Sequence, residues 1–101
     1  MNSDQAIEAL AALAQETRLG VFRLLVKHEP QGLPAGEIAR RLGVAHNTLS
    51  AHLAGLTRAG LTTAERQSRS IIYRANIAAI QRLAEFLIED CCGGVPEACG
   101  L

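Results

Sequence analysis

The stretch that decides the fold of this chain is EIARRLGVAHNTLSAHLAGLTRAGL, residues 37–61. Its apolar residues recur every three or four positions in two runs, as expected for two helices, and the segment Gly43-Val44-Ala45 separates the runs. In the second run, Leu49, Leu53 and Leu56 lie on one stripe. Two helices joined by so short a turn are typical of a helix-turn-helix unit.

The face of the second helix opposite the leucine stripe is small and polar. It is made by Asn47, Thr48, Ser50, Ala51, Ala54 and Arg58. A helix can lie deep in the major groove of DNA only when bulky side chains do not hold its backbone away from the bases. The pattern therefore favours a helix that reads DNA.

The sequence on both sides of this unit predicts further helices and a β-hairpin. Ser3 and Asn76 are the expected N-caps of the first and last helices. Leu19, Phe22 and Val26 form the expected apolar stripe of the second helix, with Leu25 beside it. The predicted elements, in chain order, are helices over Asp4–Ala14, Glu16–His28, Pro34–Leu42 and His46–Ala59, strands over Leu61–Arg66 and Ser70–Ala75 around a Gln67-Ser68-Arg69 tip, and a fifth helix from Ile77 toward the cysteines. The fold class is mainly α with a β-hairpin.

The charges of the chain are unevenly distributed although they sum to zero. Residues 38–82 contain seven arginines and one glutamate, so 7 − 1 gives +6. The residues before them give 3 − 5 = −2, and the residues after them give 0 − 4 = −4. A basic middle between acidic ends is typical of a surface that binds a polyanion.

Length and composition limit the class of protein. At 101 residues the chain forms one small domain, and so small a core favours association of two copies. The polar N-terminus and the lack of a long apolar stretch predict a cytoplasmic protein with no membrane partner. No Gly-rich phosphate loop or HExxH motif occurs, and Ser50 and His52 lie too close along a helix to face one another, so we expect no enzymatic activity.

The chain resembles the winged helix-turn-helix repressors of the ArsR family. The resemblance covers nearly the whole chain and is carried by Glu16–Leu19, Glu37–Val44, Thr48–Leu53, Leu56, Ala59–Leu61, Arg69 and Tyr73. It implies a fold of five helices and a two-stranded wing. It also implies a homodimer held by the first and last helices, and a roughly palindromic operator in double-stranded DNA.

The resemblance also implies roles for individual residues. The expected DNA-binding residues are Asn47, Thr48, Ser50, Ala51, Arg58 and Arg69, with Arg40 and Arg41 at the flanks. The expected dimerisation residues are Ile7, Leu10, Ile80, Leu83, Leu87 and Ile88. His52 is either a phosphate contact or a structural hydrogen-bonding residue.

Three residues depart from the family pattern. Ala45 stands where a serine usually caps the recognition helix, so Asn47 or the backbone must take over that role. Ala51 replaces a position that often carries a larger polar residue. Ser68 replaces the usual glycine at the wing tip, where a positive φ is unfavourable for serine.

All three cysteines lie in the last eleven residues, as Cys91, Cys92 and Cys99. Thiols that serve only as core residues would be scattered along the chain. A structural zinc site needs four ligands, whereas three thiolates suit a soft ion with a pyramid of three sulfurs, such as As(III) or Sb(III). The sequence thus predicts a DNA-binding and dimerisation domain over residues 1–90 and an effector tail over residues 91–101.

Other effectors stay open at this stage. Cadmium, lead or bismuth are alternatives, as is a redox switch, and a thiol carrier that does not bind DNA is a rival from another class. Glu89 and Asp90 disfavour thiolates and suit a cation better than a peroxide sensor. Family members with a Cys-Cys pair and a further cysteine after the last helix resemble this tail. The favoured interpretation is a dimeric repressor that As(III) or Sb(III) releases from DNA.

Overall fold

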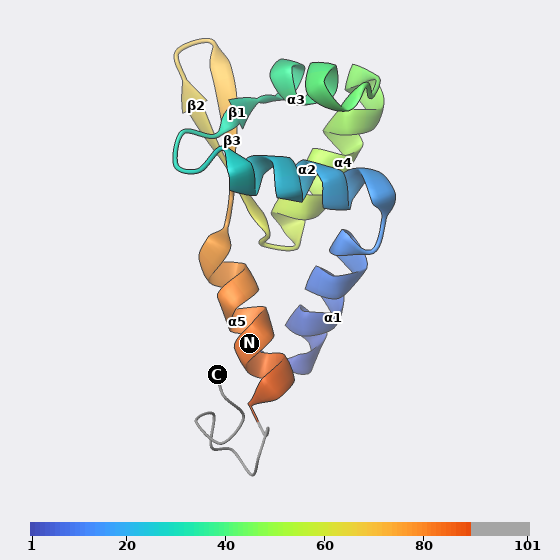
Figure 1. Cartoon of the computed structure of the whole chain (residues 1–101), viewed down its shortest axis with the longest axis vertical. Coiled ribbons are helices and arrows are strands. Elements are labelled where there is room, and N and C mark those ends of the chain that lie inside the picture. The colour runs from blue at the N-terminus through green and yellow to red at the C-terminus, as the bar shows by residue number, and fades with distance from the viewer. Residues whose placement is uncertain (90–101) are drawn as a thin grey trace.

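The computed structural model of the chain describes residues 1–89. The order of its elements is α1 (Ser3–Leu13), α2 (Glu16–Lys27), β1 (Leu33–Pro34), α3 (Ala35–Leu42), α4 (His46–Arg58), β2 (Thr62–Gln67), β3 (Ser70–Ala75) and α5 (Ile77–Ile88). Figure 1 shows α2, α3, α4 and the sheet grouped at one end, with α1 and α5 extending from that group. This is the predicted winged helix-turn-helix fold, with five helices and a two-stranded wing.

The sheet contains one strand that the sequence analysis did not predict. Its order is β1-β3-β2, and all neighbours are antiparallel. The added strand, β1, is two residues long and pairs Leu33 with Tyr73. It lies within a turn-forming segment that contains Pro30, Gly32 and Pro34, so no alternating pattern could indicate it.

The core lies between α2, α4 and the helices packed on them. The leucine stripe of α4 is buried as predicted, with Leu49, Leu53 and Leu56 at 0 to 1% exposure. The stripe predicted for α2 is wrong in its phase. Phe22 and its neighbour Leu25 are buried, but Leu19 and Val26 are exposed, because α2 turns Val21 inward instead.

The N-cap of α1 also differs from the prediction. The cap is Asn2 and not Ser3: the Asn2 side chain accepts from the Gln5 backbone N–H at 2.8 Å, and the Gln5 side chain accepts from the Asn2 backbone N–H at 2.9 Å. This reciprocal capping box needs a long side chain at the third helical position, and only an Asn2 cap places Gln5 there. Asn76 caps α5 as predicted and accepts from the Ala79 N–H.

Gly32 holds the turn before β1 close against β3. Its φ is +75°, and a β-carbon there would lie 2.5 Å from the carbonyl oxygen of Tyr73. Gly43, between α3 and α4, has a similar φ of +65°, but nothing lies within 4 Å of a β-carbon at that position. A side chain at Gly43 would therefore cause backbone strain alone, whereas a side chain at Gly32 would cause both strain and a steric clash.

We expect Gly32→Ala to destabilise the protein more than Gly43→Ala. Left-handed strain alone should cost Gly43→Ala about 1 to 2 kcal/mol of unfolding free energy. Gly32→Ala should lose about 2 to 4 kcal/mol, because the clash adds to the strain. Urea denaturation of both variants measures the difference. Equal losses would show that the turn moves away from β3 at little cost.

Candidate nucleic-acid interface

Helix α4 turns its small polar face to the outside. Asn47, Thr48, Ser50 and Ala51 are all exposed, while the leucines on the opposite side are buried. The structure therefore brings the four residues expected to face bases or phosphates together on one accessible surface. No side chain makes a capping hydrogen bond at Ala45, so Asn47 does not take over the role of the missing serine.

The wing projects beside this face. Strands β2 and β3 pair from Thr62 with Ala75 to Gln67 with Ser70, which makes the turn one residue shorter than predicted. Ser68 occupies the turn with a φ of +58°, so serine adopts the positive φ that the sequence analysis regarded as unfavourable. The exposed Arg66 and Arg69 lie at this end of the wing.

A groove of about 400 Å³ joins the start of α3, the exposed face of α4 and the wing. Its lining includes Ser50 and Arg69, two of the predicted DNA-binding residues, together with His46 and Tyr73. His46 is exposed, as expected from the sequence, which predicted no binding role for it. Its position at the first residue of α4 was the available signal, because the first turn of a recognition helix points toward the base edges.

Arg40 and Arg41 share the carboxylate of Glu37. Arg40 pairs with it through both Nε and Nη2, and Arg41 Nε donates to Glu37 Oε1 at 2.8 Å. The hydrogen bond from Arg40, followed by that from Arg41, lowers the pKa of Glu37 from 4.5 to about 2. Glu37 lies one residue before the segment whose charge was summed, so the count missed an acid that offsets part of this basic surface.

Arg74 also has internal partners. Its Nη1 donates to Glu65 Oε2 at 2.6 Å, and its Nε donates to the carbonyl of Pro30 at 2.8 Å. Arg74 thereby ties β3 to β2 and to the turn before β1. Among residues 1–89, the arginines of the α4 and wing region that make no ion pair are Arg58, Arg66 and Arg69. A phosphate contact should therefore come from these three.

His52 lies on the side of α4 that faces α2. Its Nδ1 is 3.2 Å from Nη1 of Arg18, and the residue is half-buried. Of the two roles left open for His52, the structure supports the structural one.

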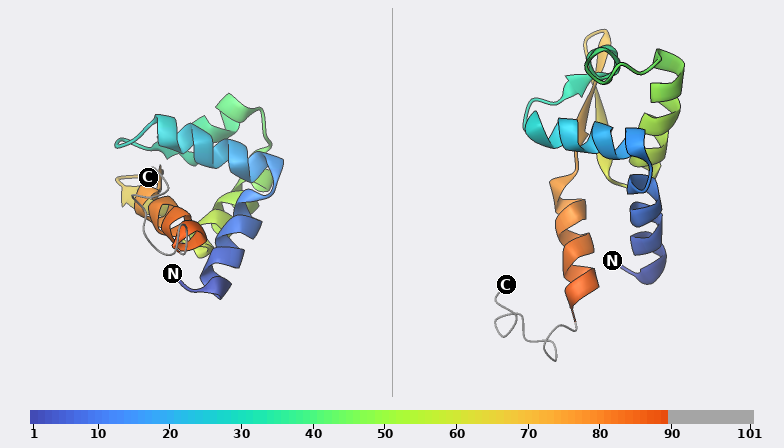
Figure 2. Two further views of the ribbon diagram at one scale, coloured as in Figure 1. Left: turned by 60° about the horizontal axis from the view of Figure 1, so that its bottom comes forward. Right: turned by 45° about the vertical axis from the view of Figure 1, so that its right-hand side comes forward.

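The residues expected at the dimer contact divide into two groups. Ile7, Leu10, Leu87 and Ile88 are 64, 42, 58 and 41% exposed, whereas Leu83 is 5% exposed. Leu83 belongs to the core of the single chain, and Ile80 packs partly against that core. Figure 2 shows α1 and α5 extending from the same side of the molecule. Of the predicted dimerisation residues, the accessible ones are therefore Ile7, Leu10, Leu87 and Ile88.

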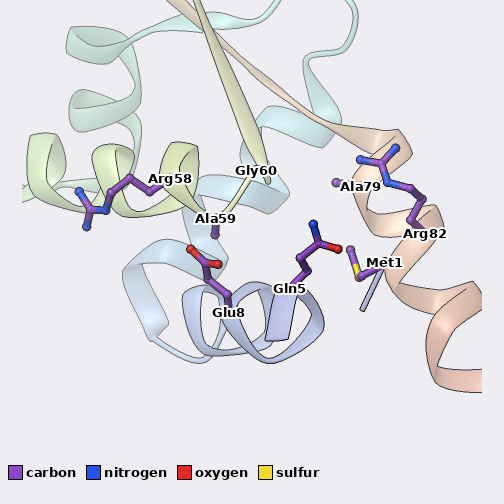
Figure 3. A pocket seen from close by; sticks show the side chains of 8 residues that line it. All are labelled: Met1, Gln5, Glu8, Arg58, Ala59, Gly60, Ala79 and Arg82. Carbon is purple, nitrogen blue, oxygen red and sulfur yellow. The ribbon is translucent and has the colours of Figure 1, made fainter. Parts of the chain in front are cut away.

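A second groove, of about 440 Å³, lies between α1, the end of α4 and α5. Figure 3 shows Gln5 and Met1 between α1 and α5, with the guanidinium groups of Arg58 and Arg82 on opposite sides. The two arginines thus do not converge on one point. Arg58 lines this groove from the last turn of α4, well away from the wing groove.

The three cysteines lie outside the described residues, so the division into a domain and an effector tail stays a prediction. Within residues 1–89, no three His, Cys, Asp or Glu side chains gather closely enough to hold a metal ion. No helix in that part of the chain is long and apolar enough to cross a membrane.

The exposed polar helix, the basic wing and the groove between them form a surface of the kind that binds DNA. Residues 13–64 match the model of a helix-turn-helix domain family. The chain belongs to the ArsR family of winged helix-turn-helix transcription regulators. Membership in this family argues against a thiol carrier that does not bind DNA. A DNA-binding regulator needs the basic wing and the small polar face of α4, whereas a thiol carrier needs neither.

Three similar proteins illustrate the relationship. The transcriptional activator HlyU of Vibrio cholerae is 33% identical over 86 residues, which cover 85% of this chain and 77% of HlyU. The structure of an ArsR-like transcriptional regulator from Rhodococcus sp. RHA1 is 30% identical, with a TM-score of 0.73 over 83% of this chain and 76% of that one. A homodimeric winged helix-turn-helix DNA-binding domain from Mycobacterium bovis is 28% identical, with a TM-score of 0.67 over 88% of this chain and 86% of that one.

We expect Thr48→Ala and Ser50→Ala each to weaken operator binding by about 5- to 150-fold, because a close polar contact to a base is worth about 1 to 3 kcal/mol. Titration of labelled operator measures the loss. Ser3→Ala is the matched control, since Ser3 is also an exposed helical serine but lies at the start of α1. An unchanged operator affinity in both α4 variants would show that α4 does not bind in the major groove of DNA.

Arg69→Ala should weaken binding to all DNA sequences alike. Arg69 is the expected phosphate contact at the wing turn, so its loss should lower the salt slope of binding by about one. Measurements at several salt concentrations with operator and with unrelated DNA test this, and Arg82→Ala on α5 is the control. A loss confined to the operator would mean that Arg69 reads bases.

Proposed function

We propose that the chain is a homodimeric transcriptional repressor that leaves its operator when As(III) or Sb(III) binds to Cys91, Cys92 and Cys99. The observation that carries this proposal is the position of the cysteines in the sequence. All three fall after α5, and Cys91 follows its last residue, Ile88, by three positions. The thiols therefore adjoin a terminal helix with exposed apolar residues.

The chemistry of these residues favours a soft trivalent ion. Each thiol gives its proton to a hydroxyl of As(OH)3 or Sb(OH)3, which leaves as water, and the ion is then held in a three-coordinate pyramid of sulfurs. Three thiols are the full complement for that geometry, so no fourth ligand is needed.

Dimerisation is supported by the accessible apolar residues of α1 and α5 and by the homodimeric state of the Mycobacterium bovis domain. A dimer places two copies of α4 on one DNA duplex, which matches a palindromic operator with half-sites about one helical turn or a multiple apart. The relative pose of the two copies then depends on the terminal helices.

Effector binding next to α5 can therefore change DNA affinity through the dimer. A coupling free energy of about 1 to 3 kcal/mol would weaken operator binding by about 5- to 150-fold, and operator DNA would weaken arsenic binding by the same factor. A structure described as a possible transcriptional regulator for arsenical resistance supports this effector class: it is 25% identical, with a TM-score of 0.69 over 79% of this chain and 80% of that one.

Redox control is the second candidate. The observation that favours it comes from the relative HlyU, since one solved structure of HlyU is of its reduced form. In this chain, oxidation would join two of the three thiols in a disulfide. The acidic neighbours of Cys91 disfavour the reactive thiolate, so we rank redox control second.

A titration of the protein on its promoter DNA tests both candidates. Arsenite, antimonite, cadmium, lead, bismuth and hydrogen peroxide are added separately. Release by arsenite and antimonite at lower concentrations than by the other ions supports the proposal. Release by peroxide that a dithiol reductant reverses, without release by arsenite, would replace it with redox control. A preference for cadmium or lead would change the effector class.

A further inference from the structure

Arg18 connects three helices at one point. It lies in the first turn of α2, and its Nε donates to the carbonyl of Ala12 at 2.6 Å. Its Nη2 donates to the carbonyl of Ala11 at 3.4 Å, and its Nη1 lies 3.2 Å from Nδ1 of His52 on α4. In residues 1–89, no other side-chain hydrogen bond joins α2 to α1 or to α4.

The two carbonyls belong to the last turn of α1, which ends at Leu13. Carbonyls in the last turn of a helix lack partners further along the helix and carry the negative end of its dipole. A guanidinium is well suited to this position, because it is always charged and presents several N–H donors in a fixed plane. Arg18 therefore anchors the C-terminal end of α1.

The contact with His52 has a defined direction. A guanidinium only donates hydrogen bonds, so Nδ1 of His52 must accept, and the ring proton of the neutral imidazole must be on Nε2. The stem of Arg18 lies along the next turn of α4 as well, since a β-carbon at Gly55 would be 3.9 Å from Cδ of Arg18. The side chain thus meets α4 at two successive turns.

We infer that Arg18 is a positioning residue that fixes the pose of the recognition helix α4 relative to α1. Helix α1 carries the exposed Ile7 and Leu10 of the proposed dimer surface, and α4 carries Thr48 and Ser50. Arg18 therefore fixes the position of the DNA-contacting face of α4 relative to the exposed apolar residues of α1. The inference depends on the DNA-binding role of α4 and not on the identity of the effector.

Three substitutions of His52 isolate the hydrogen bond. In His52→Asn the amide oxygen can take the place of Nδ1 and accept from Arg18. In His52→Gln the amide lies one carbon further out, at the place of Nε2, and His52→Leu keeps an apolar bulk without any acceptor. Asparagine and glutamine are both polar amides, so their comparison holds even where leucine disturbs folding.

The measured quantity is the ratio of affinity for operator to affinity for unrelated DNA. We expect His52→Asn to keep this ratio within about threefold of wild type, and His52→Gln and His52→Leu to lower it by about 10-fold, as expected for a hydrogen bond to a charged group. Arg18→Lys should lower it similarly, because an ammonium cannot span the two carbonyls and the imidazole together. Affinity for unrelated DNA and dimer association should not change.

Two results would overturn the inference. The same ratio in the asparagine, glutamine and leucine variants would show that the Arg18–His52 contact does not position α4. An equal loss on operator and on unrelated DNA in the glutamine and leucine variants would instead make His52 a phosphate contact.

Discussion

Replacing Cys91 or Cys92 with serine should leave operator binding unchanged in the absence of metal and abolish the response to arsenite. Each thiolate is one of three ligands, and serine is close in size to cysteine but binds soft ions poorly. The weakening of operator affinity by arsenite, about 5- to 150-fold in the wild type, should fall to about one in these variants. Arsenite-driven release from labelled operator measures it.

Cys99→Ser provides an internal comparison. This variant should also respond poorly to arsenite. It keeps the adjacent pair Cys91 and Cys92, so a methylated arsenical that needs only two sulfurs can still release it from operator DNA. Full release by arsenite in all three variants would show that the cysteines do not bind the effector. Loss of operator binding in the absence of metal would mean that the thiols support the fold instead.

Leu87→Glu should disrupt the dimer and DNA binding together. Leu87 is 58% exposed near the end of α5, so a charge there costs the single chain little but would be buried in a helix-to-helix contact. A monomer holds only one half-site, and losing the linked second site should cost about 100-fold or more in operator affinity. Sedimentation and operator titration on the same sample test both effects.

Leu19→Glu is the matched control for this prediction. Leu19 is also a large apolar side chain, 44% exposed, but it lies on α2 and not on the terminal helices. Its substitution should leave association and operator affinity nearly unchanged. A fully dimeric Leu87→Glu protein would place the contact elsewhere, as would a monomeric Leu19→Glu protein.

The sequence was sufficient to predict the parts of the fold with strong local patterns. The leucine stripe of α4 and the hairpin rich in β-branched residues indicated the helix-turn-helix and the wing, and both are confirmed. These elements depend on periodicity and turn residues close in sequence. The exposed face of α4 followed directly, because residues opposite a buried stripe must point outward.

Features that depend on distant contacts were not predictable in this way. The apolar residues of α2 fit more than one stripe, and the packing of α2 against α1, α4 and β3 decides that Val21 is buried rather than Leu19 and Val26. Similarly, Leu83 looked equivalent to Leu87 in sequence, but α5 turns Leu83 into the core of its own chain.

The positive charge available to DNA was overestimated because ion pairs were not counted. A sum of charges over a segment does not show that Glu37 sits beside Arg40 and Arg41, or that Glu65 pairs with Arg74. Nor could it indicate that Arg18 contacts a histidine 34 residues further along the chain. The pairs of Glu37 with Arg40 and Arg41 are i,i+3 and i,i+4 neighbours on α3, so spacing alone could have indicated them. The contact between Arg18 and His52 is different, because it is set by how α2 packs on α4.

The measurement that tests the central claim most directly is X-ray absorption at the arsenic edge of the arsenite-loaded wild-type protein, which counts the sulfur atoms bound to the ion. The account predicts three sulfurs per arsenic, from Cys91, Cys92 and Cys99, with operator affinity lowered in the same preparation. A shell with two sulfurs or fewer would contradict the three-thiolate site, and so would three bound sulfurs with undiminished operator affinity.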